Sequence, residues 1–137
     1  MLIKFPYYKQ QDKMDCGPTC LRMIVKHYGR NYPIQKLRAL CQINLGGVNL
    51  LGLSEAAEKI GFRYLGVKLT IDQLKEAELP CILHWRQNHF VILYKVKKGL
   101  FYIADPGADL VKLTEKGFRI LKFKSKISPF PVKFITY

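Results

Sequence analysis

The stretch Met14-Asp15-Cys16-Gly17-Pro18-Thr19-Cys20-Leu21 decides the fold of this chain. Gly17 and Pro18 allow a tight start to a helix, because the N–H group that proline lacks would have no helical partner in the first turn. Apolar residues then recur at the helical period, at Leu21, Ile24, Val25 and Tyr28. Gly29 is a natural end, so the sequence predicts a helix whose N-terminus carries Cys16.

Cys16 is a candidate nucleophile because of this position. The unpaired N–H groups and the positive end of the dipole at a helix N-terminus favour a thiolate. An isolated cysteine is more often a buried structural residue, and Cys20, Cys41 and Cys81 are expected in the core. Cys16 differs from them because a glycine follows it, a glutamine-containing loop precedes it, and a histidine–aspartate pair is available later in the chain.

A cysteine nucleophile needs a base that takes its proton and a group that orients the base. A hairpin predicted in the second half of the chain supplies both. Its strands cover His89–Val96 and Leu100–Ala104. Lys97-Lys98-Gly99 is expected as a three-residue loop with glycine at the left-handed position, and Asp105 directly follows the second strand.

The register of this hairpin decides whether His89 and Asp105 meet. If Val96 pairs with Leu100, facing residue numbers sum to about 196, and Val91 lies opposite Asp105. His89 is then a diagonal neighbour of Asp105 on the same face, with about 7 to 8 Å between their Cα atoms. An aspartate can span that gap to an imidazole N–H and fix its tautomer. We therefore expect His89 to act as general base and Asp105 to orient it.

The tetrahedral intermediate of such a reaction needs hydrogen-bond donors for its oxyanion. The backbone N–H of Cys16 and the side-chain amide of Gln10 are the natural candidates. From the sequence alone, Gln11 competes with Gln10 for this role. His84 is expected to be structural or exposed, because its strand offers no evident carboxylate partner.

The order of the predicted elements indicates an α+β fold. Further helices are expected over residues 34–41, over 50–60 with Asn49 as its cap, and from a capping box at Thr70 through Glu78. Strands are expected over residues 62–69, 81–85, 89–96, 100–104 and 110–113, and Thr114 can cap a last helical turn. N-terminal helices packed on a C-terminal antiparallel sheet are typical of this class.

The totals fit a single globular domain. The chain has 137 residues, of which 49% are hydrophobic and 24% charged. We assign residues 1–124 to one domain and 125–137 to a basic, proline-containing tail, expected as an extended edge segment or the start of a linker. No stretch approaches the roughly 18 to 20 apolar residues that span a bilayer, and the N-terminus lacks the apolar core of a signal peptide. A soluble, cytosolic protein is therefore expected.

Cysteine spacing and charge narrow the partners. The four cysteines form no CxxC pair, and a zinc site combining them with His84 or His89 would lack any standard ligand spacing, so no metal or other cofactor is expected. The net charge is +13, and ten of the 23 basic residues lie beyond residue 93. This excess suits an anionic lipid surface, although a solvated basic face is the simpler interpretation. Nucleic acid is the weaker partner, because no nucleic-acid-binding motif accompanies the charge.

Three segments together are similar to a known family. Gln10–Leu21, Asn88–Val91 and Ala104–Pro106 resemble motifs of the bacteriocin-processing cysteine peptidase domain found in peptidase-containing ABC transporters. The likeness runs from about residue 5 to residue 123 and includes Gly52–Ala57. It implies a papain-like fold, and cleavage of precursor peptides after a double-glycine leader.

The resemblance also implies roles for individual residues. In the family's terms Cys16 is the nucleophile, His89 the general base and acid, Asp105 its orienting partner and Gln10 the oxyanion donor. The implied partners are a precursor peptide and the transmembrane and ATPase domains of a transporter, at the cytoplasmic face of the bacterial inner membrane. The alternative is a catalytically silent module that only binds leader peptides, and the presence of Cys16 argues against it.

Two further residues are expected to bind substrate. Trp85 precedes the predicted turn Arg86-Gln87-Asn88, and Asn88 is its last residue, directly before His89; there the two can narrow the cleft until only glycine fits. For Trp85, simple packing is an equally good interpretation.

Overall fold

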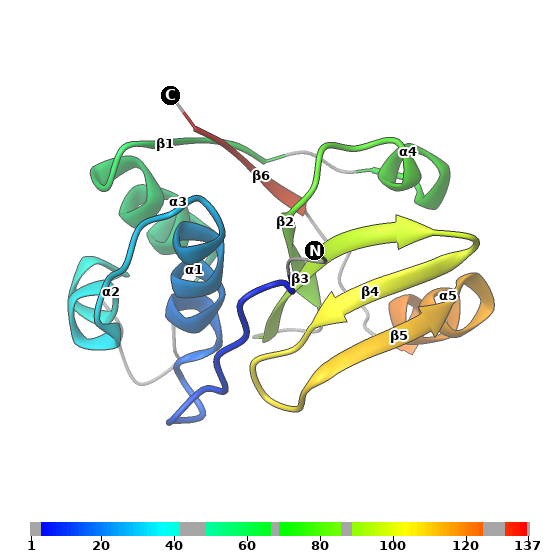
Figure 1. The fold of residues 1–137 in the computed structure, drawn as a ribbon, viewed down its shortest axis with the longest axis horizontal. Helices are drawn as coiled ribbons and strands as arrows, with labels where there is room; N and C mark the ends of the chain where they lie inside the picture. The colour runs from blue at the N-terminus through cyan, green and yellow to red at the C-terminus, as the bar shows by residue number, and fades with distance from the viewer. Residues whose placement is uncertain (1–3, 42–48, 67–68, 86–88, 125–130, 137) are drawn as a thin grey trace.

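The computed structural model describes residues 4–41, 49–66, 69–85, 89–124 and 131–136. Its helices are α1 (Cys16–His27), α2 (Ile34–Cys41), α3 (Leu50–Lys59), α4 (Ile71–Lys75) and α5 (Glu115–Lys124). Its strands are β1 (Phe62–Gly66), β2 (Cys81–Trp85), β3 (His89–Lys97), β4 (Leu100–Ala104), β5 (Leu110–Thr114) and β6 (Pro131–Thr136). The strands form one antiparallel sheet in the order β1-β6-β2-β3-β4-β5 (Figure 1). The predicted α+β class, with helices ahead of an antiparallel sheet, is confirmed.

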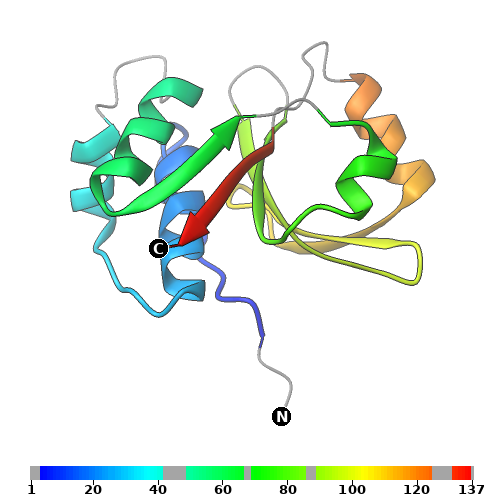
Figure 2. The same ribbon diagram turned by 90° about the horizontal axis from the view of Figure 1, so that it is seen from above.

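The sheet separates two hydrophobic cores. Figure 2 shows α1, α2 and α3 on one side of the central strands, and α4 and α5 on the other. Phe90 and Ile92 of β3 pack into the core under α1, whereas Val91 and Leu93 pack with Phe118 of α5. Because successive side chains of a strand point to opposite faces, β3 is buried on both and has no polar alternation from Phe90 to Leu93. Burying each of these side chains stabilises the fold by about 1.5 to 3 kcal/mol.

Helix α1 has the extent that its sequence predicts. Gly29 has a φ of 87°, the left-handed conformation in which a residue without Cβ readily follows a helix end. Nine of its twelve residues are buried, in agreement with its apolar stripe. The Cys20 thiol donates a hydrogen bond to the Phe90 carbonyl oxygen at 3.3 Å. This contact seats α1 on β3 one turn away from Cys16.

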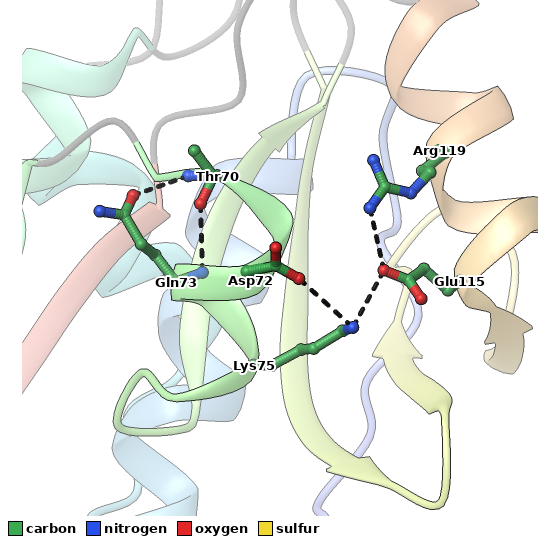
Figure 3. Close-up of polar contacts among 6 residues, drawn as sticks. All are labelled: Thr70, Asp72, Gln73, Lys75, Glu115 and Arg119. Carbon is green, nitrogen blue, oxygen red and sulfur yellow. Dashed lines mark hydrogen bonds and ion pairs between the residues drawn. The ribbon is translucent and has the colours of Figure 1, made fainter.

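The short elements follow their predicted caps. Asn49 accepts a hydrogen bond from the Gly52 N–H at 2.8 Å and starts α3. Thr70 and Gln73 form the predicted capping box of α4, although the helix ends at Lys75 and not at Glu78 (Figure 3).

An ion-pair network joins the two helices that cover the second face of the sheet. Lys75 of α4 lies 3.0 Å from Glu115 of α5 and 3.5 Å from Asp72, and Arg119 lies 3.0 Å from Glu115 (Figure 3). The hydrogen bond and charge of Lys75, followed by those of Arg119, lower the pKa of Glu115. Because these groups are solvated, the network orients α4 against α5 more than it stabilises the fold.

The turn predicted for the central hairpin is wrong in detail. Lys97 pairs with Leu100, so the loop has two residues, Lys98 and Gly99, whose φ values are 52° and 75°. Two consecutive positive φ values define the type I′ turn, whose twist matches that of the strands better than a three-residue loop does.

A β-bulge in β3 shifts the pairing of β3 with β4 by one residue between the turn and His89. The pairing shifts between Leu93 and Lys95, and from there Leu93 pairs with Ile103 and Ile92 with Ala104. Facing residue numbers therefore sum to 196 at this end of the hairpin, as predicted, although the turn alone would have set a different register. The extra residue of the bulge keeps His89 on the face of β3 that the sequence argument required.

Residues 131–136, expected within a tail, form strand β6. It pairs with β1 through Phe62–Gly66 and with β2 through Cys81–Leu83. The segment is thus an interior strand, and the expectation of an edge segment is wrong. Pro131 is compatible with this place because it is the first residue of its strand, where a missing N–H costs little.

Candidate active site

Cys16 is the first residue of α1, as its sequence predicts, and only 5% of it is exposed. Asp15 is the N-cap residue of this helix, and the Asp15 carbonyl oxygen accepts a hydrogen bond from the Thr19 N–H at 2.9 Å. The thiol therefore lies at the positive end of the helix dipole, with its helix seated on β3 by Cys20.

His89 and Asp105 come together at the end of the central hairpin. His89 is the first residue of β3, and Asp105 directly follows β4. Their side chains are joined by a contact of 2.7 Å between His89 Nε2 and Asp105 Oδ1. The Gly107 N–H donates to the same carboxylate oxygen at 2.9 Å. Both side chains are about one-quarter exposed, so the pair is accessible from solvent, but most of its surroundings are protein atoms.

The environment favours the charged form of His89. Burial by itself disfavours the imidazolium, but the hydrogen bonds of His89 with Asp105 and with Cys16, and the charges of both, outweigh this and raise the pKa of His89 to about 9. Near neutral pH the ring therefore carries a proton. A positive imidazolium within hydrogen-bond reach of a sulfur at a helix N-terminus stabilises the thiolate, the form that attacks a carbonyl.

Gln10 belongs to the same cluster. Its backbone N–H donates to the Pro106 carbonyl oxygen at 2.8 Å, which fixes this segment beside the turn after β4. A Cβ atom placed on Gly107 would lie 3.3 Å from His89 Cε1 and 3.4 Å from Gln10 Oε1, so all three residues meet at this turn. Gln11, the competing choice, is exposed.

The orientation of the Gln10 amide follows from its neighbour Asp12. Gln10 Nε2 donates to the Asp12 carbonyl oxygen at 3.0 Å, a contact that the amide oxygen could not make. An amide nitrogen carries two hydrogens, so one is left for a second acceptor such as an oxyanion.

Tyr7 is a residue near the site that the sequence argument missed. Its hydroxyl donates to the Asp105 carbonyl oxygen at 2.7 Å. Burial, and then the charges of Asp109 and Asp105, raise the pKa of Tyr7, so the hydroxyl keeps its proton for this bond. Only the proximity of Tyr7 to Gln10 in the sequence could have hinted at it, and no spacing rule connects either residue with Asp105.

The other predicted core residues are buried. Cys20, Cys41 and Cys81 are between 0% and 2% exposed, which confirms their assignment to the core. Burial raises the pKa of Cys20, and raises that of Cys41 to about 12 despite the opposing charge of Lys59. These two thiols are therefore far less reactive at neutral pH than a thiolate would be. His84 stacks on Phe90, with 4.6 Å between the ring centroids.

The structure informs only one of the two expected substrate-binding positions. Trp85 is the last residue of β2 and pairs in register with His89, so its backbone adjoins the site. Asn88 lies outside the described residues. Within the described part of the chain, no group of three or more His, Cys, Asp or Glu residues is arranged to hold a metal ion, and no helix is long and apolar enough to cross a membrane.

This combination of fold and site defines a class of protein. N-terminal helices packed on an antiparallel sheet, with a cysteine from the first helix hydrogen-bonded to a histidine from the sheet, are the features of a papain-like cysteine peptidase. The Peptidase C39 family model matches residues 4–124, and the chain belongs to this family.

Individual relatives agree with this assignment. The chain is 36% identical over 103 residues to the probable microcin-H47 secretion/processing ATP-binding protein MchF of Escherichia coli, covering 75% of this chain and 15% of that protein. It is 38% identical over 115 residues to the lactococcin-G-processing and transport ATP-binding protein LagD of Lactococcus lactis, covering 80% and 16%. The chain thus spans about one-sixth of the length of these relatives.

A solved structure extends the likeness to the fold. A double glycine motif protease from an AMS/PCAT transporter, crystallised with its leader peptide, superposes with a TM-score of 0.87 at 30% identity. The match covers 98% of this chain and 93% of the solved chain.

Proposed function

We propose that this chain removes double-glycine leaders from bacteriocin or other precursor peptides and that it does so as part of peptide export by an ABC transporter. The observation that carries the proposal is the 2.7 Å contact between His89 Nε2 and Asp105 Oδ1, with Cys16 hydrogen-bonded to the same ring. A thiol, an imidazole and a carboxylate linked in this order are the groups that acyl transfer through a thioester requires. The names of the relatives, and the leader peptide bound to the superposing protease, supply the substrate class.

The reaction assigns one task to each residue. The Cys16 thiolate attacks the carbonyl carbon of the second glycine, and the oxygen becomes an oxyanion. The backbone N–H of Cys16 and the second hydrogen on Gln10 Nε2 stabilise that oxyanion. The His89 imidazolium gives its proton to the leaving amine, the C–N bond breaks, and a thioester forms. His89, oriented by Asp105, then takes one proton from water while the hydroxyl adds to the thioester carbon; the thiolate leaves, and the leader is released as a carboxylic acid that ionises in solvent.

The requirement for glycine follows from a narrow cleft beside the nucleophile. We assign Trp85 and Asn88 to the walls of this cleft, since both lie within four residues before His89 in the sequence. A cleft too narrow for a Cβ atom selects glycine at the two substrate positions that precede the scissile bond. A larger side chain there would collide with the walls and keep the substrate carbonyl away from the sulfur.

The transporter context sets the partners and the location. The relatives combine processing with ATP-binding in chains about six times as long as the region matched here. We assign transmembrane and ATPase domains of such a transporter as partners of this domain, at the cytoplasmic face of the bacterial inner membrane. The net charge of +13 suits the anionic lipid headgroups of that face.

The test uses a synthetic leader–core peptide with a double glycine, the purified chain and mass spectrometry. We expect one cut after the second glycine, and no cut by Cys16→Ala at an unchanged melting temperature. Gln10→Ala, with Gln11→Ala as its matched control, tests the oxyanion donor: the first should lower kcat by about 100-fold or more, and the second should not. Cleavage that survives in Cys16→Ala would exclude this nucleophile, and leader binding without any cleavage would indicate a silent docking module.

A further inference from the structure

The buried carboxylate of Asp15 is a feature of the site that the mechanism above does not use. Asp15 directly precedes Cys16, and only 1% of it is exposed. It is the N-cap residue of α1, with φ of −92° and ψ of 6°, yet its side chain makes no capping hydrogen bond. A carboxylate at this position ordinarily accepts hydrogen bonds from N–H groups of the first helical turn.

The carboxylate is turned instead toward the neighbouring helix. Asp15 Oδ1 lies 3.0 Å from Nε of Arg38, which α2 supplies. The two partners differ in exposure, because the Arg38 side chain is 44% exposed and the Asp15 side chain only 1%. Loss of the arginine would therefore leave a buried negative charge without its cation, whereas loss of the carboxylate would leave only a half-solvated arginine.

The direction of the carboxylate matters for the chemistry. A carboxylate folded back onto the N-terminus of α1 would place a negative charge at the helix end that carries Cys16, and this charge would oppose a thiolate on that residue. Other titratable groups around Cys16 include His89 from β3 and Cys20 one turn along α1. Neither of these groups is the partner of Arg38 in its ion pair, which is formed with the Asp15 carboxylate.

We infer that Arg38 is a positioning residue for the nucleophile, which holds the buried Asp15 carboxylate away from the N-terminus of α1 and neutralises it beside the Cys16 thiolate. A test of this inference by peptide cleavage rests on the proposed function, whereas a test by chemical alkylation of Cys16 does not.

The thiol-based experiment measures alkylation of the purified chain by iodoacetamide as a function of pH. Peptide mapping assigns the modified cysteine, and Cys16→Ala supplies the background from the other thiols. We expect Arg38→Met to move the alkylation profile to higher pH by about one unit, equivalent to about tenfold slower reaction on its acid side. Arg38→Lys should restore most of the rate, because it returns a cation to the same helix. Lys36→Met removes an exposed charge from α2 and is the matched control that should leave the profile unchanged.

The decisive variant is the double substitution Arg38→Met with Asp15→Asn. If the unpaired Asp15 carboxylate is what slows alkylation in Arg38→Met, replacing it with a neutral amide should bring the alkylation profile back toward that of the wild type. Asp15→Asn alone should then be milder than Arg38→Met alone, although both break the same ion pair. A double variant no faster than Arg38→Met, or an Arg38→Met profile equal to that of the wild type, would overturn the inference and leave a purely structural ion pair.

With a double-glycine peptide as substrate, the same variants should separate kcat from KM. Arg38→Met is expected to lower kcat by about 10- to 100-fold with little change in KM, because leader binding does not involve the thiolate. A wild-type chain that cleaves no such peptide contradicts the proposed function alone, since the alkylation profiles still test Arg38. Should Arg38→Met fail to fold, Arg38→Gln removes the cation but keeps a polar side chain, and it replaces Arg38→Met in the same comparison with Asp15→Asn.

Discussion

At the scale of residues, the contact between His89 and Asp105 sets the charge of the site. Asp105 is the first of the partners that raise the pKa of His89 to about 9 against the effect of burial. In Asp105→Asn this support is lost, and the pKa of His89 falls toward its ordinary value. The alkaline limb of kcat/KM, which reports loss of the imidazolium proton, should therefore move from about pH 9 to lower pH.

A pH titration of kcat/KM with the double-glycine peptide measures this shift. Asp109→Asn removes a carboxylate from the same turn without touching the His89 contact and serves as the control. An alkaline limb that stays in place in Asp105→Asn would mean that Asp105 is structural.

The sequence could predict residues whose role follows from local geometry. The start of a helix identifies Cys16 as a candidate, and the alternation of strand residues identifies His89 with Asp105, because both patterns lie in neighbouring positions of the sequence. Tyr7 and Arg38 could not be found in this way. Each acts through one contact with a residue distant in the chain, Tyr7 with the Asp105 backbone and Arg38 with Asp15, and composition carries no trace of such contacts.

At the scale of elements, the central hairpin shows how a correct result arose from a wrong detail. The predicted three-residue loop would have given the register of the site without a bulge. The actual loop has two residues, and the irregularity between Leu93 and Lys95 compensates for it. Lysine at position 98 gave no signal of a left-handed residue, so the type I′ turn could not be anticipated.

The same turn offers a test of stability. Lys98 has a φ of 52°, a conformation that costs most L-residues free energy and that asparagine tolerates better. Lys98→Asn should raise the free energy of unfolding by up to about 1 kcal/mol, measured by urea denaturation. Lys97→Asn, one residue earlier and within the strand, should not stabilise. Peptide cleavage should be unchanged by either substitution, and a less stable Lys98→Asn would contradict the assignment of the turn.

At the scale of the whole molecule, the order of the strands was the least predictable feature. The residues of β6 have strand-like composition, but nothing local says that they lie between β1 and β2. Pairing between distant segments depends on which edges are open after the rest of the sheet has formed, and the sequence pattern of one strand does not encode this. The approximate positions of α1 to α4 and of β1 to β5 were predictable because their sequence patterns are local, whereas β6 was expected within a tail.

The charge of the whole molecule leads to the last prediction. Lys95 and Lys112 flank the Tyr102 ring, at 5.0 and 5.4 Å from its centroid, and add to a net charge of +13. If the domain works against anionic lipid, it should sediment with vesicles containing phosphatidylglycerol but not with phosphatidylcholine alone, and salt should release it. Lys95→Glu with Lys112→Glu should weaken this binding and leave cleavage of a soluble peptide unchanged.

The matched control for that pair is Lys36→Glu with Lys59→Glu, which changes the net charge equally on α2 and α3. Equal losses from the two pairs would mean that only the total charge matters, because a field summed over the surface does not depend on which lysines supply it. A larger loss from Lys95 and Lys112 would place the lipid against the face of β3, β4 and β5. Absence of binding by the wild-type chain would remove lipid from the partners, and the excess of lysine would then be a solvated surface.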